Sequence, residues 1–307
     1  MNTIAPILNL LFIIISALLA IAFYTLRERK FLGYIQLRKG PNKPNITALT
    51  IPIADAGKLF SKEKKNSILI NLNYHSLTPI TIIILALLLW PIFPIPATSF
   101  FIKFNILYFL CITRIRIYTI FIAGWSSNSR WGLLGALRRI AQTISYEVRI
   151  SLILICFILH PSTINTLTII QDFYSWTALL LTPLALSWII SILAETHRTP
   201  FDFAEGESEL VSGFNIEYKS SIFAIIFIAE YINILLISIL TIVIITKSYY
   251  RLELTIKRII LSLIFIWTRG ALPRLRYDIL IDNLWKKLLP ISLTWIFTTI
   301  SLTSIIK

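Results

Sequence analysis

The sequence predicts an all-α polytopic membrane protein that forms a single membrane domain over its 307 residues. The mean hydropathy is +0.78 and 56% of the residues are hydrophobic, values typical of a chain with many membrane spans and not of a soluble domain. Eight apolar runs are long enough, or nearly so, for a helix of about 20 residues to cross a bilayer. These predicted spans lie near residues 4–26, 77–96, 102–123, 140–159, 176–194, 221–245, 259–272 and 288–306.

The loops between the predicted spans indicate an orientation. Loops 27–76, 124–139, 195–220 and 273–287 hold about 20 Lys and Arg residues, whereas the segments on the other side hold about six. Cationic loops face the cytoplasm-like side of a membrane, which is the bacterial cytoplasm or the mitochondrial matrix. We therefore expect both termini on the opposite face. The start of the chain has no signal or transit pattern, so the first run is expected to remain as a span.

The first loop contains a second helical pattern. After a turn at Gly40-Pro41, residues 51–60 place apolar and polar side chains at helical spacing. We expect an amphipathic helix on the membrane surface there. A plain helix packed on the other loops fits the pattern equally well. Asp55 lies on or beside the apolar side of this helix, which is a costly place for a carboxylate without a role.

Several other chemistries find no support. Cys111 and Cys156 lie in apolar runs without partner spacing, so we expect no disulfide framework, zinc site or iron–sulfur cluster. The three histidines are scattered, and neither a phosphate-binding loop nor a catalytic triad is evident. The net charge is +14, but the cations lie in short loops between spans. We therefore expect lipid headgroups and acidic protein partners as counter-charges, and no nucleic acid.

Carboxylates are concentrated in and beside the predicted spans. Glu147 falls inside the fourth span, Glu195 follows the fifth and Glu230 lies well inside the sixth. A carboxylate within a span costs about 3 kcal/mol, so three in different spans indicate a purpose. Residues 193–218 hold one cation, Arg198, and six acids. These acids are Glu195, Asp202, Glu205, Glu207, Glu209 and Glu217.

Two interpretations of these acids are open. They can form structural ion pairs, or they can form a chain of protonatable groups. The candidate partners for structural pairing are Arg138, Arg149 and Arg198. If the loop is helical, Asp202, Glu205 and Glu209 share one face, and their mutual repulsion raises at least one pKa towards neutrality. Taken alone, the loop acids fit an acidic loop solvated by water better. Their continuity with Glu147, Glu195 and Glu230 favours a chain of groups that hold and release protons near physiological pH.

Longer motifs carry a resemblance to a known family. Residues 32–42 read Leu-Gly-Tyr-Ile-Gln-Leu-Arg-Lys-Gly-Pro-Asn, residues 124–129 read Gly-Trp-Ser-Ser-Asn-Ser, and residues 141–147 read Ala-Gln-Thr-Ile-Ser-Tyr-Glu. The acidic loop and the motif at residues 229–231 extend the match. The chain resembles, nearly from end to end, the family of subunit 1 of mitochondrial NADH:ubiquinone oxidoreductase, or respiratory complex I.

The resemblance implies a subunit of a proton-pumping membrane arm in the mitochondrial inner membrane, with both termini on the intermembrane-space side. Ubiquinone would be the substrate. This chain would contain no catalytic residue, metal or redox cofactor of its own, and NADH, FMN and the Fe–S clusters would belong to partner subunits. The implied partners are the quinone-site subunits of the hydrophilic arm, neighbouring membrane-arm subunits and membrane lipids, with cardiolipin as a candidate.

The resemblance also implies roles for individual residues. The quinone chamber and its entry path would involve Arg29, Arg38, Asp55, Phe60, His197, Arg198, Phe227, Arg274 and Arg276. The proton path would involve Glu147, Glu195, Asp202, Glu205, Glu207, Glu209, Glu217 and Glu230. Quinone reduction would change the charge in the chamber, and the acidic loop would respond by reorganising or taking up protons.

Some positions depart from the family pattern. His197 stands where relatives usually carry Asn, and two unpaired arginines inside the third span are physically unfavourable. Arginines replace small or neutral residues at Arg27, Arg114, Arg116, Arg139 and Arg149. The chain also has only one methionine. Both features would follow if an invertebrate mitochondrial gene had been translated with the standard code, so that Ser codons were read as Arg and Met codons as Ile.

Two further functions stay open on the sequence alone. One is a proton-coupled transporter or ion channel that works by itself, and the other is the homologous membrane subunit of a hydrogenase-type complex. Transporters often show paired inverted halves, and this sequence shows no internal repeat. The charged loops on one face indicate a docking surface for soluble partners, and the match over residues 32–42 favours the mitochondrial family.

Overall fold

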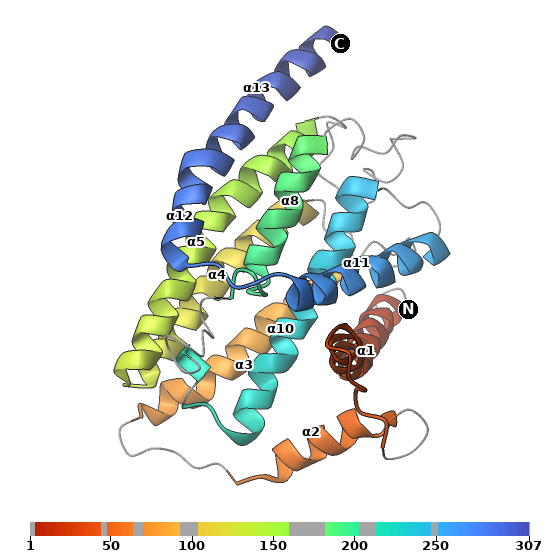
Figure 1. The fold of residues 1–307 in the computed structure, drawn as a ribbon, viewed down its shortest axis with the longest axis vertical. Helices are drawn as coiled ribbons and strands as arrows, with labels where there is room; N and C mark the ends of the chain where they lie inside the picture. The colour runs from red at the N-terminus through yellow and green to blue at the C-terminus, as the bar shows by residue number, and fades with distance from the viewer. Residues whose placement is uncertain are drawn as a thin grey trace.

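The computed structural model describes residues 4–43, 48–63, 70–92, 104–159, 182–202, 213–215, 217–246 and 251–306. Within these ranges the chain forms helices and turns and no β-strand, which confirms the all-α prediction. The α-helices are α1 (Ile4–Ile35), α2 (Ile51–Ser61), α3 (Leu72–Leu88), α4 (Asn105–Ser126), α5 (Arg130–Leu159), α8 (Thr182–Glu195), α10 (Ser220–Thr241), α11 (Arg251–Ala271), α12 (Tyr277–Asn283) and α13 (Leu289–Ile306). Figure 1 shows how they are arranged.

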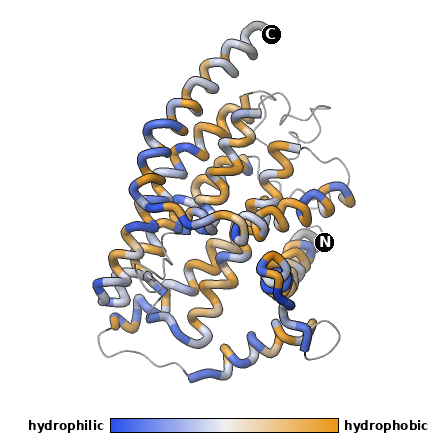
Figure 2. Tube along the Cα trace, viewed as in Figure 1, coloured by the Kyte–Doolittle hydropathy of each residue, from blue (hydrophilic) through white to orange (hydrophobic). Residues whose placement is uncertain are grey.

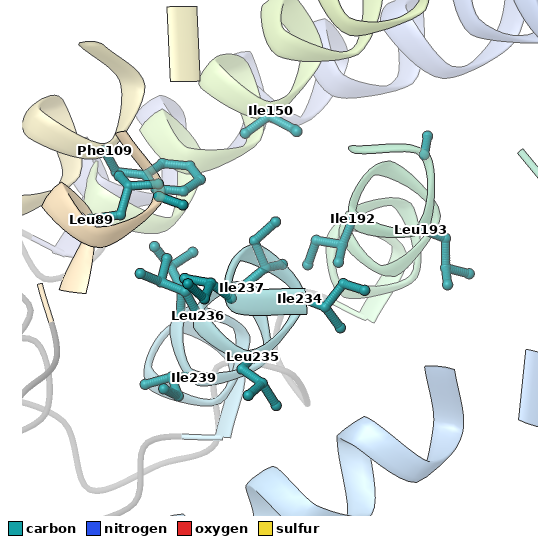
Figure 3. Packing of buried hydrophobic residues seen from close by; sticks show 14 of the residues in the cluster. Leu89, Phe109, Ile150, Ile192, Leu193, Ile234, Leu235, Leu236, Ile237 and Ile239 are labelled. Carbon is teal, nitrogen blue, oxygen red and sulfur yellow. The ribbon is translucent and has the colours of Figure 1, made fainter. Parts of the chain in front are cut away.

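Helix α10 lies in the middle of the bundle (Figure 1). Every residue from Tyr231 to Ile245 is buried. This range includes the π-helical turn Ile242–Thr246 except for Thr246, which is partly exposed. In Figure 3 the apolar side chains of α10 point in several directions, towards Phe109 of α4 on one side and Ile192 of α8 on the other. A helix that is apolar all round is expected where other helices enclose it, and this one forms the centre of the core.

Helices α4 and α5 form a closely packed pair joined by a short turn. Gly124 makes the close approach possible, because a Cβ atom added there would lie 2.2 Å from the Cβ of Ala136. A Cβ on Gly132 would likewise meet the hydroxyl oxygens of Ser127 and Ser129 at 2.5 Å. This contact fixes how the polar side chains of α4 face α5 and the neighbouring α8.

Helices α1, α2 and α11 lie on one side of the bundle, with α2 at its edge (Figure 1). Helix α1 packs against α2, α10 and α11. No residue of α2 is buried within the chain, and hydrophilic and hydrophobic residues alternate along it (Figure 2). The helix predicted over residues 51–60 is therefore present and exposed, as a surface helix should be. Its contact with a membrane stays a prediction.

A helix occupies the described part of each of the eight predicted spans. Five segments are long and apolar enough to cross a membrane, namely Leu8–Ile35, Leu72–Ile92, Asn105–Ser126, Arg130–Leu159 and Ser220–Thr246. Helix α8 is apolar but shorter, and α11 carries several charged residues. The observed α1 and α5 extend well into the predicted loops, since no proline interrupts residues 27–35 or 130–139. Eight crossings remain a prediction.

Candidate functional site

A tight turn after α8 closes back onto α5. The completely buried Gln142 of α5 donates from Nε2 to the carbonyl oxygens of Ala194 at 3.1 Å and Phe201 at 2.8 Å. Within the turn, His197 has a φ of 50°, in the left-handed region where Asn, Asp and His are enriched. Gln142 thus holds both ends of the turn and keeps the side chain of His197 inside the protein.

The turn is also fixed to the end of α11 and the segment that follows it. The hydroxyl of Thr199 donates to the carbonyl oxygen of Arg269 at 3.3 Å, and the amide of Leu275 donates to the carbonyl oxygen of Pro200 at 3.1 Å. Arg274 forms an ion pair with Asp202, with 3.3 Å between Nη2 and Oδ2. These contacts bring two of the predicted loops together around the turn.

Each of the three acids predicted in or beside the spans forms an ion pair. Glu195, at the end of α8, is buried and pairs with Arg116 of α4, whose side chain is only 10% exposed. Glu230 of α10 accepts from Nη2 of Arg139 at 2.7 Å. Each of these two pairs joins two different helices and neutralises a charge inside the bundle.

The third pair is partly open to the outside. Glu147 of α5 accepts from Nε of Arg114 at 3.1 Å, and the hydroxyl of Thr113 lies 3.5 Å from the same carboxylate oxygen. The side chain of Glu147 is 11% exposed, whereas that of Arg114 is 64% exposed. This pair therefore lies at the bundle surface, with its carboxylate facing inwards.

For Glu147, Glu195 and Glu230, the partners predicted for structural pairing were wrong. Arg114, Arg116 and Arg139 hold the three acids, and the two arginines of the third span are therefore paired. The reason is geometric, because Arg114 points towards α5 whereas Arg116 points towards the end of α8. Arg198 instead pairs with Glu28. Arg149 is fully buried and donates from Nη2 to the carbonyl oxygen of Ser187 at 2.5 Å, while its Nε and Nη1 have no partner among the described residues.

Three neighbouring cavities lie beside these groups, and each shares lining residues with the next. The first has a volume of about 260 Å³ and is lined by the turn after α8, Asp202, Arg139 and Arg269, together with Phe227, Glu230 and Tyr231 of α10. The second, of about 30 Å³, shares His197 and Glu230 with the first and reaches Glu195. The third, of about 10 Å³, shares Glu195 with the second and reaches Glu147. The first two volumes are large enough for water molecules, and the third is at the lower limit for a single one.

His197 lies where the first two cavities meet. Burial lowers the pKa of its imidazole well below the usual value of 6.5, and the nearby Arg139 and Arg116 lower it further. Neither ring nitrogen has a hydrogen-bond partner among the described residues. Burial therefore favours the neutral imidazole, whose two ring nitrogens are closed off from water although the residue lines both cavities.

Glu28 forms a buried cluster that the sequence did not indicate. It lies on α1, is 4% exposed, and accepts hydrogen bonds from Arg198, Arg269 and Tyr231. Burial tends to lower the pKa of Arg198, but the negative charge of Glu28 has the larger opposite effect, so the pKa of Arg198 lies above its usual range. In the sequence, Glu28 looks like one charge in the run Arg27–Lys30, and only its partners, 170 to 241 residues away, distinguish it.

The other predicted site residues lie apart from the cavities. Asp55 of α2 pairs with Arg29 of α1 at 2.9 Å, with both side chains about half exposed. Phe60 is exposed on α2, Arg38 donates to Gln36 after α1, and Arg276 precedes α12. Glu217 lies at the other end of the acidic loop, before α10. Glu205, Glu207 and Glu209 lie outside the described residues, so the helix face predicted to be shared by Asp202, Glu205 and Glu209 stays a prediction.

This arrangement suits proton and solvent handling better than covalent chemistry. Acids from α5, α8 and α10 border a row of cavities, and a carboxylate can take up or release a proton beside ordered water. Among the residues that the structure describes, no group of three His, Cys, Asp or Glu side chains could hold a metal ion.

Long apolar helices with ionisable groups inside the bundle define the class as a polytopic all-α membrane protein. Residues 8–300 match the sequence pattern of the NADH dehydrogenase family, and the chain belongs to that family. It is 48% identical over 302 residues to NADH-ubiquinone oxidoreductase chain 1 of Anopheles gambiae, and this alignment covers 97% of this chain and 96% of that protein. The same protein of Locusta migratoria is 46% identical over 299 residues, covering 97% and 95%. That of Nycticebus coucang is 44% identical over 295 residues, covering 93% and 92%.

Proposed function

We propose that this chain is a membrane subunit of NADH-ubiquinone oxidoreductase in the mitochondrial inner membrane. It acts together with other subunits of that enzyme, which carry NADH, FMN and the Fe–S clusters, while this chain binds no redox cofactor. Its contribution is to form part of the ubiquinone site and to couple quinone reduction to proton translocation. The observation that carries the proposal is the row of cavities that links the turn after α8 to Glu195 and Glu147.

The cavity of about 260 Å³ is the proposed quinone end of this row. Arg198 and Arg269 can donate to the carbonyl oxygens of a quinone, and Phe227 supplies an apolar surface for its ring. The isoprenoid tail would reach this chamber from the bilayer along α1 and the exposed apolar side chains of α2, which include Ile53 and Phe60. Arg29 and Asp55 join the two helices at this entrance. Arg38 and Arg276 would lie further out, where hydrophilic-arm subunits dock.

The acids beyond the cavity are the proposed proton path. Reduction of the quinone places negative charge in the chamber, and the nearest balancing groups are Asp202 and Glu230 with their arginines. Protonation or movement of one acid weakens its ion pair and changes the field at the next. Glu195 and Glu147 would pass this change into the membrane arm. Glu205, Glu207, Glu209 and Glu217 would supply the protonatable loop beside it.

The proposed orientation follows from the distribution of cations. The ends of α4 and α8 and the start of α10 would face the matrix, where the hydrophilic arm binds, and both termini would face the intermembrane space. Anionic lipids, with cardiolipin as a candidate, would neutralise exposed cations at the proposed matrix-side ends of the helices, such as Arg130 at the start of α5.

Purification in mild detergent tests the proposal. The chain should migrate within a very large assembly that oxidises NADH with ubiquinone and is inhibited by rotenone. Migration as a free monomer without that activity would contradict the proposal and favour a transporter or channel. Migration in an assembly that oxidises hydrogen and not NADH would favour the hydrogenase-type complex.

A further inference from the structure

Glu28 is the point where four separate segments of the chain meet. Its Oε1 accepts from Nη1 of Arg198 at 2.9 Å, and Nη1 of Arg269 binds the same oxygen. Its Oε2 accepts from the hydroxyl of Tyr231 at 2.7 Å. The four residues belong to α1, the turn after α8, α11 and α10. One buried carboxylate therefore holds together groups that are remote in sequence.

The partners of Glu28 also contact one another. The guanidinium carbon of Arg198 lies 4.7 Å from the ring centroid of Tyr231, in a cation–π arrangement. The ring of Tyr24, one turn before Glu28 on α1, meets that of Tyr231 edge to face at 5.8 Å. The hydroxyl of Tyr24 donates to the carbonyl oxygen of Ser262 on α11 at 3.2 Å. The cluster is thus closed on several sides, so its members have little freedom to move.

All three partners of Glu28 line the cavity of about 260 Å³, whereas Glu28 itself does not. Two guanidinium groups so close together repel each other, and Glu28 is the carboxylate with which both form an ion pair. A guanidinium carries five N–H donors in a fixed plane, so donors remain after the pair with Glu28 is made. The carboxylate therefore determines which edges of Arg198 and Arg269 face the cavity.

We propose that Glu28 is a positioning residue for the ligand of this cavity. It holds Arg198 and Arg269 so that their free N–H groups meet the carbonyl oxygens of a quinone headgroup, and it makes the cavity wall move with α1. This inference rests on the proposed function, because the ligand class comes from there. Glu28 acts through the arginines and touches no reacting atom.

The test uses the assembled enzyme and replaces Glu28 by Gln. Without the negative charge the two arginines repel each other and turn away from their present positions. The KM for a short-chain ubiquinone should rise about tenfold, the effect of losing one charge-assisted hydrogen bond, and kcat should change less. NADH oxidation by a water-soluble acceptor that bypasses the quinone should stay at the wild-type rate. Asp282→Asn is the matched control, since Asp282 pairs with Lys286 at 2.9 Å on the exposed surface of α12.

A second variant separates positioning from a general structural role. Glu28→Gln combined with Arg269→Gln removes one charge of each sign and leaves Arg198 without a repelling neighbour. The double variant should assemble even if the single variant does not, but its KM should stay raised, because Arg269 is itself a proposed donor to the quinone and Arg198 is no longer held by Glu28. A KM unchanged in Glu28→Gln, a wild-type KM in the double variant, or failure of both variants to assemble would overturn the proposal. If the wild-type enzyme itself fails to reduce ubiquinone with NADH, the proposed function fails first.

Discussion

The buried pair between Arg116 and Glu195 allows a worked prediction of stability. The two side chains are 10% and 6% exposed, so solvent screens their attraction very little. Replacing Glu195 by Gln leaves a buried guanidinium that has lost its carboxylate and cannot release its proton. Removing one partner of a buried pair lowers the stability of the folded protein by about 3–5 kcal/mol. A loss of about 3 kcal/mol in the barrier to unfolding corresponds to roughly a hundredfold faster inactivation.

The opposite replacement should cost less. Arg116→Met leaves a buried carboxyl group, which becomes neutral when it takes up a proton, and methionine fills most of the space of the arginine stem. The double variant Arg116→Met with Glu195→Gln contains no buried charge at this position. Replacing both members of a buried pair by uncharged groups is often nearly neutral, so the double variant should be more stable than Glu195→Gln alone.

The assay is the rate of thermal inactivation of the assembled enzyme in detergent, measured for the wild type and the three variants. Glu195→Gln should inactivate fastest, Arg116→Met more slowly, and the double variant close to the wild type. The four rates form a double-mutant cycle whose coupling term measures the pair. Effects of the two single replacements that simply multiply in the double variant would refute the ion pair.

Three further predictions concern other parts of the chain. His197 has a lowered pKa in the folded chain, so below about pH 6.5 the unfolded chain binds more protons than the folded one. Acid should therefore destabilise the wild type more than it destabilises His197→Asn. Equal pH profiles of thermal inactivation in the two proteins would contradict this. His75 stacks on Tyr218 with ring centroids 4.2 Å apart, so His75→Ala should speed hydrogen exchange of the backbone near Tyr218. The control Tyr74→Leu, on the exposed side of α3, should leave that exchange unchanged. Unchanged exchange in His75→Ala would show that the stacking does not hold Tyr218 in place. If the gene uses an invertebrate mitochondrial code, mass spectrometry of peptides should show Ser at positions 114 and 116, which would also remove the pairs with Glu147 and Glu195; Arg at both positions would disprove that hypothesis.

The helices could be predicted because their signals are local. The apolar run of α10 is long, continuous and free of charge apart from Glu230, and the hydrophobic effect requires such a run to be enclosed or to lie in a membrane. The spacing of residues 51–60 likewise predicted α2. The C-terminal end of α1 and the N-terminal end of α5 were harder to predict. Both helices extend beyond the apolar run through segments that contain Arg, a residue that is compatible with a helix.

The ion pairs could not be predicted, since they depend on how the helices are rotated against one another. Arg114 and Arg116 are two positions apart and point in different directions along α4, so one meets Glu147 on α5 and the other meets Glu195 on α8. The sequence identified the acids but not which cations would hold them. Glu28 shows the same limit, because nothing near it in the sequence indicates that Arg269 lies beside it.

The central claim is that the buried acids couple quinone reduction to proton translocation. Glu230 tests it most directly, because it lies between the first two cavities and pairs with Arg139 at 2.7 Å. The measurement is NADH-driven proton uptake and quinone reduction by the enzyme reconstituted in vesicles, with Glu253→Gln on α11 as a control that lies outside the proposed path. In Glu230→Gln both rates should fall well below those of the control. Wild-type rates of both quinone reduction and proton translocation in Glu230→Gln would contradict the claim.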